Sequence, residues 1–182
     1  MKNVPHQINQ IPRLTNALSV FRQLIQDERN LDDDGVVGDA LARAKVYTFR
    51  KKNRSIQRLL VAEHQKSAAS QGTRTCARDL RRLFQLLGFL TPEGLLSDDA
   101  TRLVALRDDS LGLEARAIWS TSLEKMSLSD DFGTSHPYRI LLRLVREHPG
   151  LRGPFLGLCL QARNDSEAEF QRMKRLATRT DA

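Results

Sequence analysis

Apolar residues recur every three or four positions along most of the chain, which is the spacing of amphipathic helices. In residues 12–29 this spacing predicts a first helix, and Pro12 is favourable in its first turn. The apolar positions of this helix are Leu14, Leu18, Phe21, Leu24 and Ile25. Acidic residues and glycines then occupy much of residues 30–38, which predicts an acidic loop.

A second helical region follows the loop. Asp39 can cap a helix that begins at the next residue and extends to about position 64. Either this helix is continuous, or it breaks near Asn53 and Ser55 caps a new helix. The polar run at 65–72 predicts a turn or a short linker before the next element.

The helix expected at residues 76–87 has two sharply different faces. Thr75 can cap it, and Gly88 can end it in the left-handed conformation that glycine adopts most readily. Its apolar face consists of Cys76, Leu80, Leu83 and Leu87, with Phe84 beside them. Its opposite face consists of Arg78, Arg81, Arg82 and Gln85. We therefore expect one buried face and one cationic, solvent-facing side.

A short hairpin is expected directly after this helix. In residues 89–96, one apolar pair precedes and one follows a turn that contains Pro92 and Gly94. Ser97 then provides a cap for another helix through Leu106, with two aspartates near its positive end.

A helix with a cationic face, a tight two-stranded wing and a closing helix are the parts of a winged helix-turn-helix. Their order resembles winged-helix DNA-binding domains, particularly the target-recognition parts of type II restriction endonucleases. The resemblance covers roughly residues 40–106 and rests on Arg78-Asp79-Leu80 through Leu86-Leu87-Gly88-Phe89-Leu90, then Gly94-Leu95-Leu96-Ser97. A generic small α+β core with the same helix–hairpin–helix order is the alternative.

The second half of the sequence also predicts helices. They are expected at 111–126, from Ser135-His136-Pro137 to His148-Pro149-Gly150, at 152–162, and from 167 to about 178, with Ser127–Gly133 as a loop. Asn164, Asp165 or Ser166 can cap the last one, whose outward side chains are Arg172, Lys174, Arg175 and Arg179. These helices form either a second helix-turn-helix unit or a helical dimerisation or packing layer.

The expected fold class is therefore mainly α with a small β-wing, a winged helix-turn-helix in which a second helix-turn-helix unit can follow in tandem. Residues 1–38 would hold the first helix and the acidic loop. Residues 39–108 would form the winged-helix DNA-binding unit, and residues 109–182 the second helical unit.

Positive charge is concentrated in one part of the chain. The 182 residues contain 29 lysines and arginines against 22 acids, a net charge of +7. Residues 40–82 hold twelve of these cations and only two acids, Glu63 and Asp79, so this segment carries +10 and the remainder −3. Such segregation favours contact with several phosphates of a polyanion, whereas a merely solvated basic face is the plainer alternative.

Membrane and secreted classes are not expected. The sequence contains no apolar run near the ~18 residues of a membrane span, and its polar N-terminus is unlike a signal peptide. Cys76 and Cys159 lie among apolar neighbours and are expected to be small, unpaired core residues of a reducing cytoplasm. With DNA as partner, the location expected is cytoplasmic and nucleoid-associated.

Motifs for catalysis, metals and cofactors are incomplete. A calcium-loop pattern begins at Asn30, but Leu41 stands where a bidentate glutamate is needed. His64-Gln65-Lys66 has the His-x-Lys form of phospholipase-D-like nucleases, but Gln71 replaces the later aspartate and no second copy of the motif exists. No phosphate loop, zinc ligand pairing or carboxylate–lysine nuclease motif occurs. We expect no catalytic residue, metal or cofactor in this chain.

These patterns favour sequence-specific binding of double-stranded DNA. The 76–87 helix would enter the major groove, and the basic residues before it would hold the phosphate backbone. The expected contact residues are Arg50, Lys51, Arg54, Arg58, Arg74, Arg78, Arg81, Arg82, Gln85, Arg172 and Arg175.

The resemblance implies a recognition module or non-catalytic subunit of a restriction or defence system, with a catalytic partner subunit or domain. A homodimer of this DNA-binding module is compatible with the same predicted elements. The alternatives are a free-standing transcription regulator, a protein–protein adaptor with a basic surface, and an enzyme whose site the sequence does not reveal.

Overall fold

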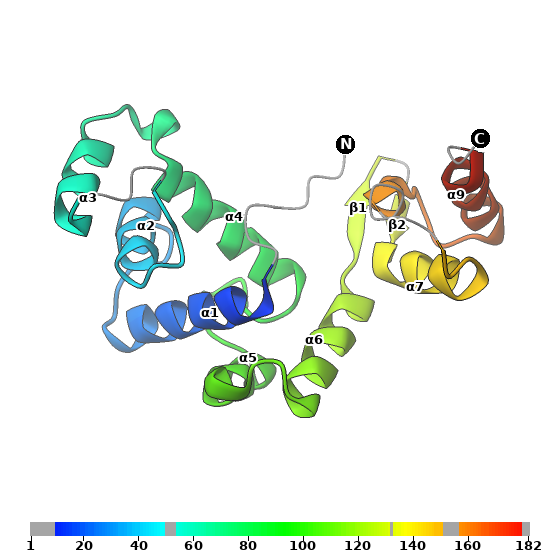
Figure 1. Ribbon diagram of the computed structural model, residues 1–182, viewed down its shortest axis with the longest axis horizontal. Helices are drawn as coiled ribbons and strands as arrows, with labels where there is room; N and C mark the ends of the chain where they lie inside the picture. Colours follow the sequence, from blue (N-terminus) through cyan, green and yellow to red (C-terminus); the bar gives the residue numbers. More distant parts are fainter. Residues whose placement is uncertain (1–9, 50–53, 132, 151–156, 180–182) are drawn as a thin grey trace. The chain divides into compact units, whose positions relative to one another are not determined.

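The computed structural model describes residues 10–49, 54–131, 133–150 and 157–179. The described chain is mainly helical and contains one small antiparallel sheet (Figure 1). It divides into two compact units, one within residues 5–118 and one within residues 119–182. Among the described helices, none combines the length and the apolar character needed to cross a membrane.

The first two helices begin with different caps. Helix α1 (Ile11–Gln26) has a proline in its first turn, and its predicted apolar positions 18, 21 and 24 are buried. Helix α2 (Asp34–Arg43) begins six residues earlier than predicted, because Asp33 and not Asp39 caps it. The Oδ1 of Asp33 accepts hydrogen bonds from the backbone N–H groups of Gly35 (2.8 Å) and Val36 (3.3 Å). Half of the predicted acidic loop is therefore helical.

The predicted long helix over 40–64 is broken. Helix α2 ends at Arg43, and Lys45 has a φ of +60°, a left-handed conformation incompatible with a continuing helix. Helix α3 (Ile56–His64) starts after Ser55, whose Oγ accepts the backbone N–H of Arg58. Ser55 is thus confirmed as a fresh cap, and a 3-10 turn η1 (Ala68–Ser70) follows.

Helix α4 (Gly72–Leu86) has the two faces that the sequence predicts but begins four residues earlier. Thr75 is not its cap, because the Thr75 hydroxyl donates to the Gln71 carbonyl inside the first turn. Gly88 follows the helix with a φ of +70°, as predicted. The buried face consists of Thr73, Cys76, Ala77, Leu80, Leu83 and Phe84. Burial raises the pKa of the free Cys76 thiol to about 11.

The predicted wing is not confirmed. Between residues 89 and 96 the structure has a turn and one isolated bridge, Leu90 to Leu96, in place of two strands. Phe89 and Leu90 are adjacent yet both buried, whereas a strand with one solvated face would alternate. Ser97 caps helix α5 (Asp98–Ala105) as predicted, with its Oγ accepting the N–H of Ala100. The turn η2 (Arg107–Asp109) and helix α6 (Leu113–Lys125) follow.

Helices α1, α2, α4 and α5 surround the core of the N-terminal unit. The rings of Phe21 and Phe84 meet edge to face at 5.4 Å between centroids. Helix α1 contacts both α2 and α5, so the first helix belongs with the segment that follows it. Helices α2 and α4 pack closely, because a Cβ on Gly38 would lie 2.8 Å from the Thr73 carbonyl.

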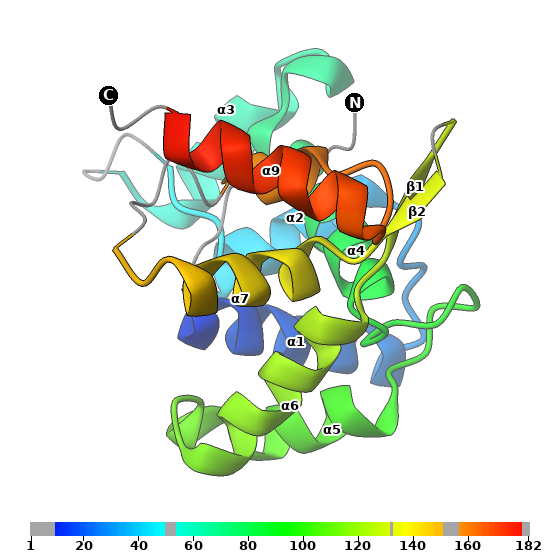
Figure 2. The same cartoon turned by 90° about the vertical axis from the view of Figure 1, so that its right-hand side faces the viewer.

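The C-terminal unit holds the sheet. Strand β1 (Leu128–Asp130) pairs antiparallel with β2 (Gly133–Ser135), where the sequence predicts a loop. The Ser129 and Thr134 hydroxyls hydrogen-bond across the pair at 2.8 Å. Helix α7 (Pro137–Glu147) lies beside helix α9 (Glu167–Arg179) in Figures 1 and 2, and the turn η3 (Gly157–Gln161) packs against both.

A small core and ion pairs hold these helices together. The buried core consists of Ile140, Leu144, Cys159, Ala162, Phe170, Met173 and Ala177. Arg143 of α7 pairs with Glu167 of α9 and lies 3.7 Å above the Phe170 ring. Lys174 pairs with Glu147 at 2.8 Å. Cys159 is free, and burial raises the pKa of its thiol to about 11.

Replacing Gly38 with alanine should lower the free energy of unfolding by about 1–3 kcal/mol, because the new methyl group would press on the α4 backbone. Gly35→Ala is the matched control on the same helix, since its Cβ would meet side-chain atoms only, the end of Arg74 at 2.9 Å and the Asp33 carboxylate at 3.1 Å. We expect that change to stay within about 0.5 kcal/mol. Urea unfolding followed by circular dichroism measures both, and equal losses would contradict the close helix contact.

Glu169 should make the C-terminal unit sensitive to acid. The hydrogen bond from Arg172 holds the pKa of this carboxyl below its ordinary 4.5, although burial opposes the shift. A lowered native pKa stabilises the fold above the unfolded pKa and loses this effect as pH falls through the native pKa. Glu169→Gln should therefore destabilise at pH 7 and do so progressively less below about pH 4.5.

Thermal melting at a series of pH values tests this expectation. The exposed Glu124→Gln serves as the control for loss of one carboxylate. A Glu169→Gln deficit that is equally large at pH 7 and in acid would show that Glu169 acts through packing alone.

Candidate nucleic-acid interface

Four exposed arginines of the basic segment lie at the start of α3 and along α4. Arg54 and Arg58 are exposed at the start of α3, and Arg78 and Arg82 are exposed on α4, one helical turn apart. Gln85 is also exposed on α4. Within the described ranges, no carboxylate pairs with any of these four arginines. They are therefore available to an external anion.

Two predicted contact residues are engaged inside the unit instead. The Arg81 guanidinium donates to Asp34 at 2.8 Å and to the Leu31 carbonyl, which ties the loop before α2 to α4. Arg74 is half-buried, and its Nε donates to Gln71 at 2.8 Å. Arg81 thus serves the fold, and Arg74 lies beside α2 rather than on the outer face.

The two acids of the basic segment contribute little negative charge to the surface. Glu63 is only 2% exposed, and its carboxylate lies at the start of α4. There it accepts the backbone N–H groups of Gly72 and Thr73 and the ammonium of Lys66, the last at 2.6 Å. This hydrogen bond raises the pKa of Lys66 above its ordinary value. Asp79 is half-buried, so the outward charge of the segment is almost wholly positive.

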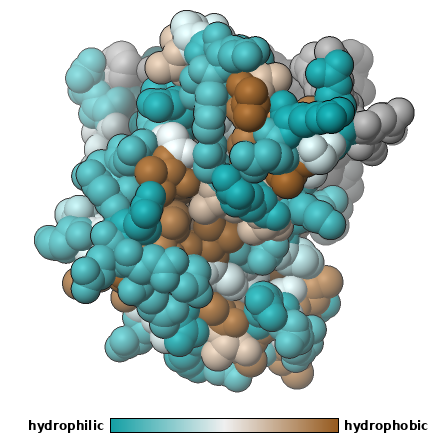
Figure 3. Space-filling view, turned by 90° about the vertical axis from the view of Figure 1, so that its left-hand side faces the viewer, coloured by the Kyte–Doolittle hydropathy of each residue, from teal (hydrophilic) through white to brown (hydrophobic). Residues whose placement is uncertain are grey.

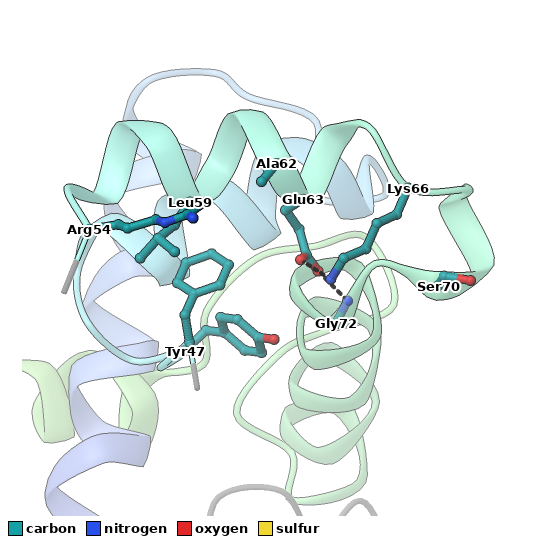
Figure 4. Close-up of a pocket in the computed structure, with 9 residues that line it drawn as sticks. Tyr47, Arg54, Leu59, Ala62, Glu63, Lys66, Ser70 and Gly72 are labelled. Carbon is teal, nitrogen blue, oxygen red and sulfur yellow. Dashed lines mark hydrogen bonds and ion pairs between the residues drawn. The ribbon is translucent and has the colours of Figure 1, made fainter. Parts of the chain in front are cut away.

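A pocket of about 460 Å³ opens beside these charges (Figure 4). Tyr47 and Phe49 form one side of it, with ring centroids 5.0 Å apart and ring planes nearly perpendicular. The remaining lining residues are Arg54, Leu59, Ala62, Glu63, Lys66, Ser70 and Gly72. Sequence reasoning missed this pocket, although two aromatic residues within a basic run are a pattern seen in nucleic-acid-binding surfaces.

A second pocket, of about 490 Å³, lies between α1 and α2. Figure 3 shows the face that carries α1, α2 and α3, with hydrophobic side chains gathered near its middle among hydrophilic ones. The charged residues of this pocket are Asp27, Arg29, Asp39 and Arg43. Because these charges balance, the pocket is not part of the basic surface.

The predicted contact residues of the C-terminal unit, Arg172 and Arg175, both take part in interactions within the structure. Arg172 is half-buried and donates to Glu169 through Nε (2.8 Å) and Nη2 (2.6 Å), which raises the pKa of the guanidinium. Arg175 is exposed. Arg50 and Lys51 lie outside the described residues, as does the side chain of Arg179.

Two of the three histidines in the described residues lie within hydrogen-bond distance of an aspartate, whereas the third, His148, has a buried Nε2 with no hydrogen-bond partner there. His64 contacts Asp39 at 2.8 Å, and His136 contacts Asp165 at 2.6 Å. Within residues 10–49, 54–131, 133–150 and 157–179, no three histidine, cysteine or acidic side chains gather as metal ligands. Comparison with known protein families, curated proteins and solved structures finds no match to this chain.

Glu63→Gln should lower the free energy of unfolding by about 1–2 kcal/mol, because the neutral amide weakens the hydrogen bonds to Lys66 and to the α4 N–H groups. Glu114→Gln removes an exposed carboxylate, paired with Arg102 at 2.7 Å, and should cost less than about 1 kcal/mol. Chemical unfolding of both variants gives the comparison. Equal effects would show that the buried carboxylate does not secure α4.

Proposed function

We propose that the N-terminal unit binds double-stranded DNA through Arg54, Arg58, Arg78 and Arg82. The supporting observation is that these exposed arginines have no carboxylate partner in the described chain, while Glu63 of the same segment is buried and neutralised. Exposed cations of this kind attract phosphates and release counterions on binding, which gives affinity without dependence on sequence. Arg81 and Arg172 are left out, because they already bind acids within their own units.

Helix α4 supplies the surface for reading bases. Arg78, Arg82 and Gln85 recur at three- and four-residue spacing, so they project from one side of a helix whose other side is core. An α-helix fits the major groove, where arginine pairs with guanine and glutamine with adenine. This role does not require the wing that the sequence led us to expect.

The setting we propose follows the resemblance to target-recognition parts of type II restriction endonucleases. The chain would act as a recognition module or non-catalytic subunit beside a catalytic partner, with duplex DNA in the cytoplasm as its ligand. Lysine and arginine contacts to phosphate need no metal, so binding should persist in EDTA.

Binding to a labelled random-sequence duplex, measured by fluorescence anisotropy against salt, tests the proposal. Replacing Arg54 and Arg58 together with alanine should reduce the slope of log affinity against log salt by about 0.9 per lost phosphate contact. Replacing Arg78 and Arg82 together with alanine should weaken binding and also reduce the differences in affinity between duplexes of different sequence. Arg116→Ala, an exposed change outside the basic segment, is the matched control.

A salt slope that is the same in wild type and in both double variants would contradict the proposal. Competition by polyglutamate as strong as competition by duplex DNA of equal charge would instead support an adaptor for acidic proteins. Thermal melting of each variant ensures that folded proteins are compared.

A further inference from the structure

The pocket at Tyr47 and Phe49 combines an aromatic wall with a cationic rim. Both rings are half-buried, so each keeps an accessible portion inside the pocket. In Figure 4, Arg54 and Leu59 lie toward one end and the Glu63–Lys66 pair toward the other, with the Tyr47 ring below them. An aromatic ring that enters here could therefore contact the wall while an attached anion reaches a cation.

The wall is fixed in place by its surroundings. The Tyr47 hydroxyl lies against the start of α4, where a Cβ on Gly72 would be only 2.4 Å from it. The edge-to-face contact with Phe49 restrains the second ring. Because both rings are held before any ligand arrives, binding loses little side-chain entropy.

The charge of the pocket matches a single negative charge. Arg54 and Lys66 contribute two positive charges, and the buried Glu63 offsets one of them. Lys66 is half-exposed and uses one hydrogen bond to hold Glu63, so its other N–H groups stay available to a ligand. A net charge of +1 suits a phosphodiester, which carries one negative charge.

We propose that this pocket receives one unpaired base of a DNA strand, with the base against Tyr47 and Phe49 and its phosphate at Arg54. This inference rests on the proposed DNA binding, because the pocket lies within the same basic segment. Unstacked bases are commonly held against aromatic side chains, and one such contact contributes about 1–3 kcal/mol. The pocket would let the protein favour duplexes that contain a bulged, mismatched or extruded base.

Two labelled duplexes of the same sequence test the inference, one fully paired and one with a single extra unpaired adenine. Wild-type protein should bind the bulged duplex about 5- to 100-fold more tightly. Tyr47→Ala and Phe49→Ala should each remove most of this preference while leaving affinity for the paired duplex within about twofold. Tyr47→Phe and Phe49→Tyr keep a ring in place and should retain it.

Each failure has a separate meaning. Binding to both duplexes without a preference, or equal losses on both in Tyr47→Ala, would overturn the pocket assignment and leave duplex binding intact. No binding to either duplex would overturn both proposals. Because loss of Tyr47 could loosen the start of α4, Arg54→Gln provides a second test that leaves the aromatic wall unchanged. The Arg54→Gln variant should show a smaller preference for the bulged duplex. An unchanged preference would show that Arg54 does not contribute to binding the unpaired base.

Discussion

The first turn of α4 is held from three directions, and the arrangement of the N-terminal unit depends on it. The buried Glu63 accepts its backbone N–H groups, Gly38 of α2 packs against Thr73, and the Tyr47 hydroxyl lies against Gly72. Each contact comes from a different segment, so this one turn sets α4 relative to α2, to α3 and to the chain between them. Once its first turn is fixed, helical periodicity determines which α4 side chains face solvent.

The availability of a cation depends on the nearest carboxylate, which sequence separation does not reveal. Arg81 and Arg82 are neighbours in a basic run, yet Arg81 is bound by Asp34, which lies 47 positions earlier, whereas Arg82 is exposed. Glu63 counts against the positive charge of its segment in any sum over the sequence, but its burial removes it from the surface. The net charge of a segment thus shows that a basic surface exists without showing which residues form it.

Local chemistry made several boundaries predictable. Ser55, Ser97 and Gly88 act within three residues of themselves, so the sequence around each was sufficient. The α2 cap was missed because Asp33 and Asp39 are both suitable, and burial of Val37 and Leu41 selects the earlier start. The short strands β1 and β2 were missed because three residues each carry little periodic signal. At 89–96, the turn was foreseen, but burial of both Phe89 and Leu90 prevents the alternation of a wing.

The pocket could not be predicted from the sequence, because the segment that lines it was expected to be helical throughout. Most of its lining residues lie within residues 40–64, where the apolar periodicity predicts one long helix. Tyr47 and Phe49 lie beneath α3 only because the helix ends at Arg43. A basic surface by itself attracts any polyanion, because Coulomb attraction depends little on the shape of the ligand. Selectivity needs groups whose geometry is fixed before binding. The Tyr47–Phe49 pair is such a group, because its rings are oriented by Gly72 and by each other rather than by a ligand.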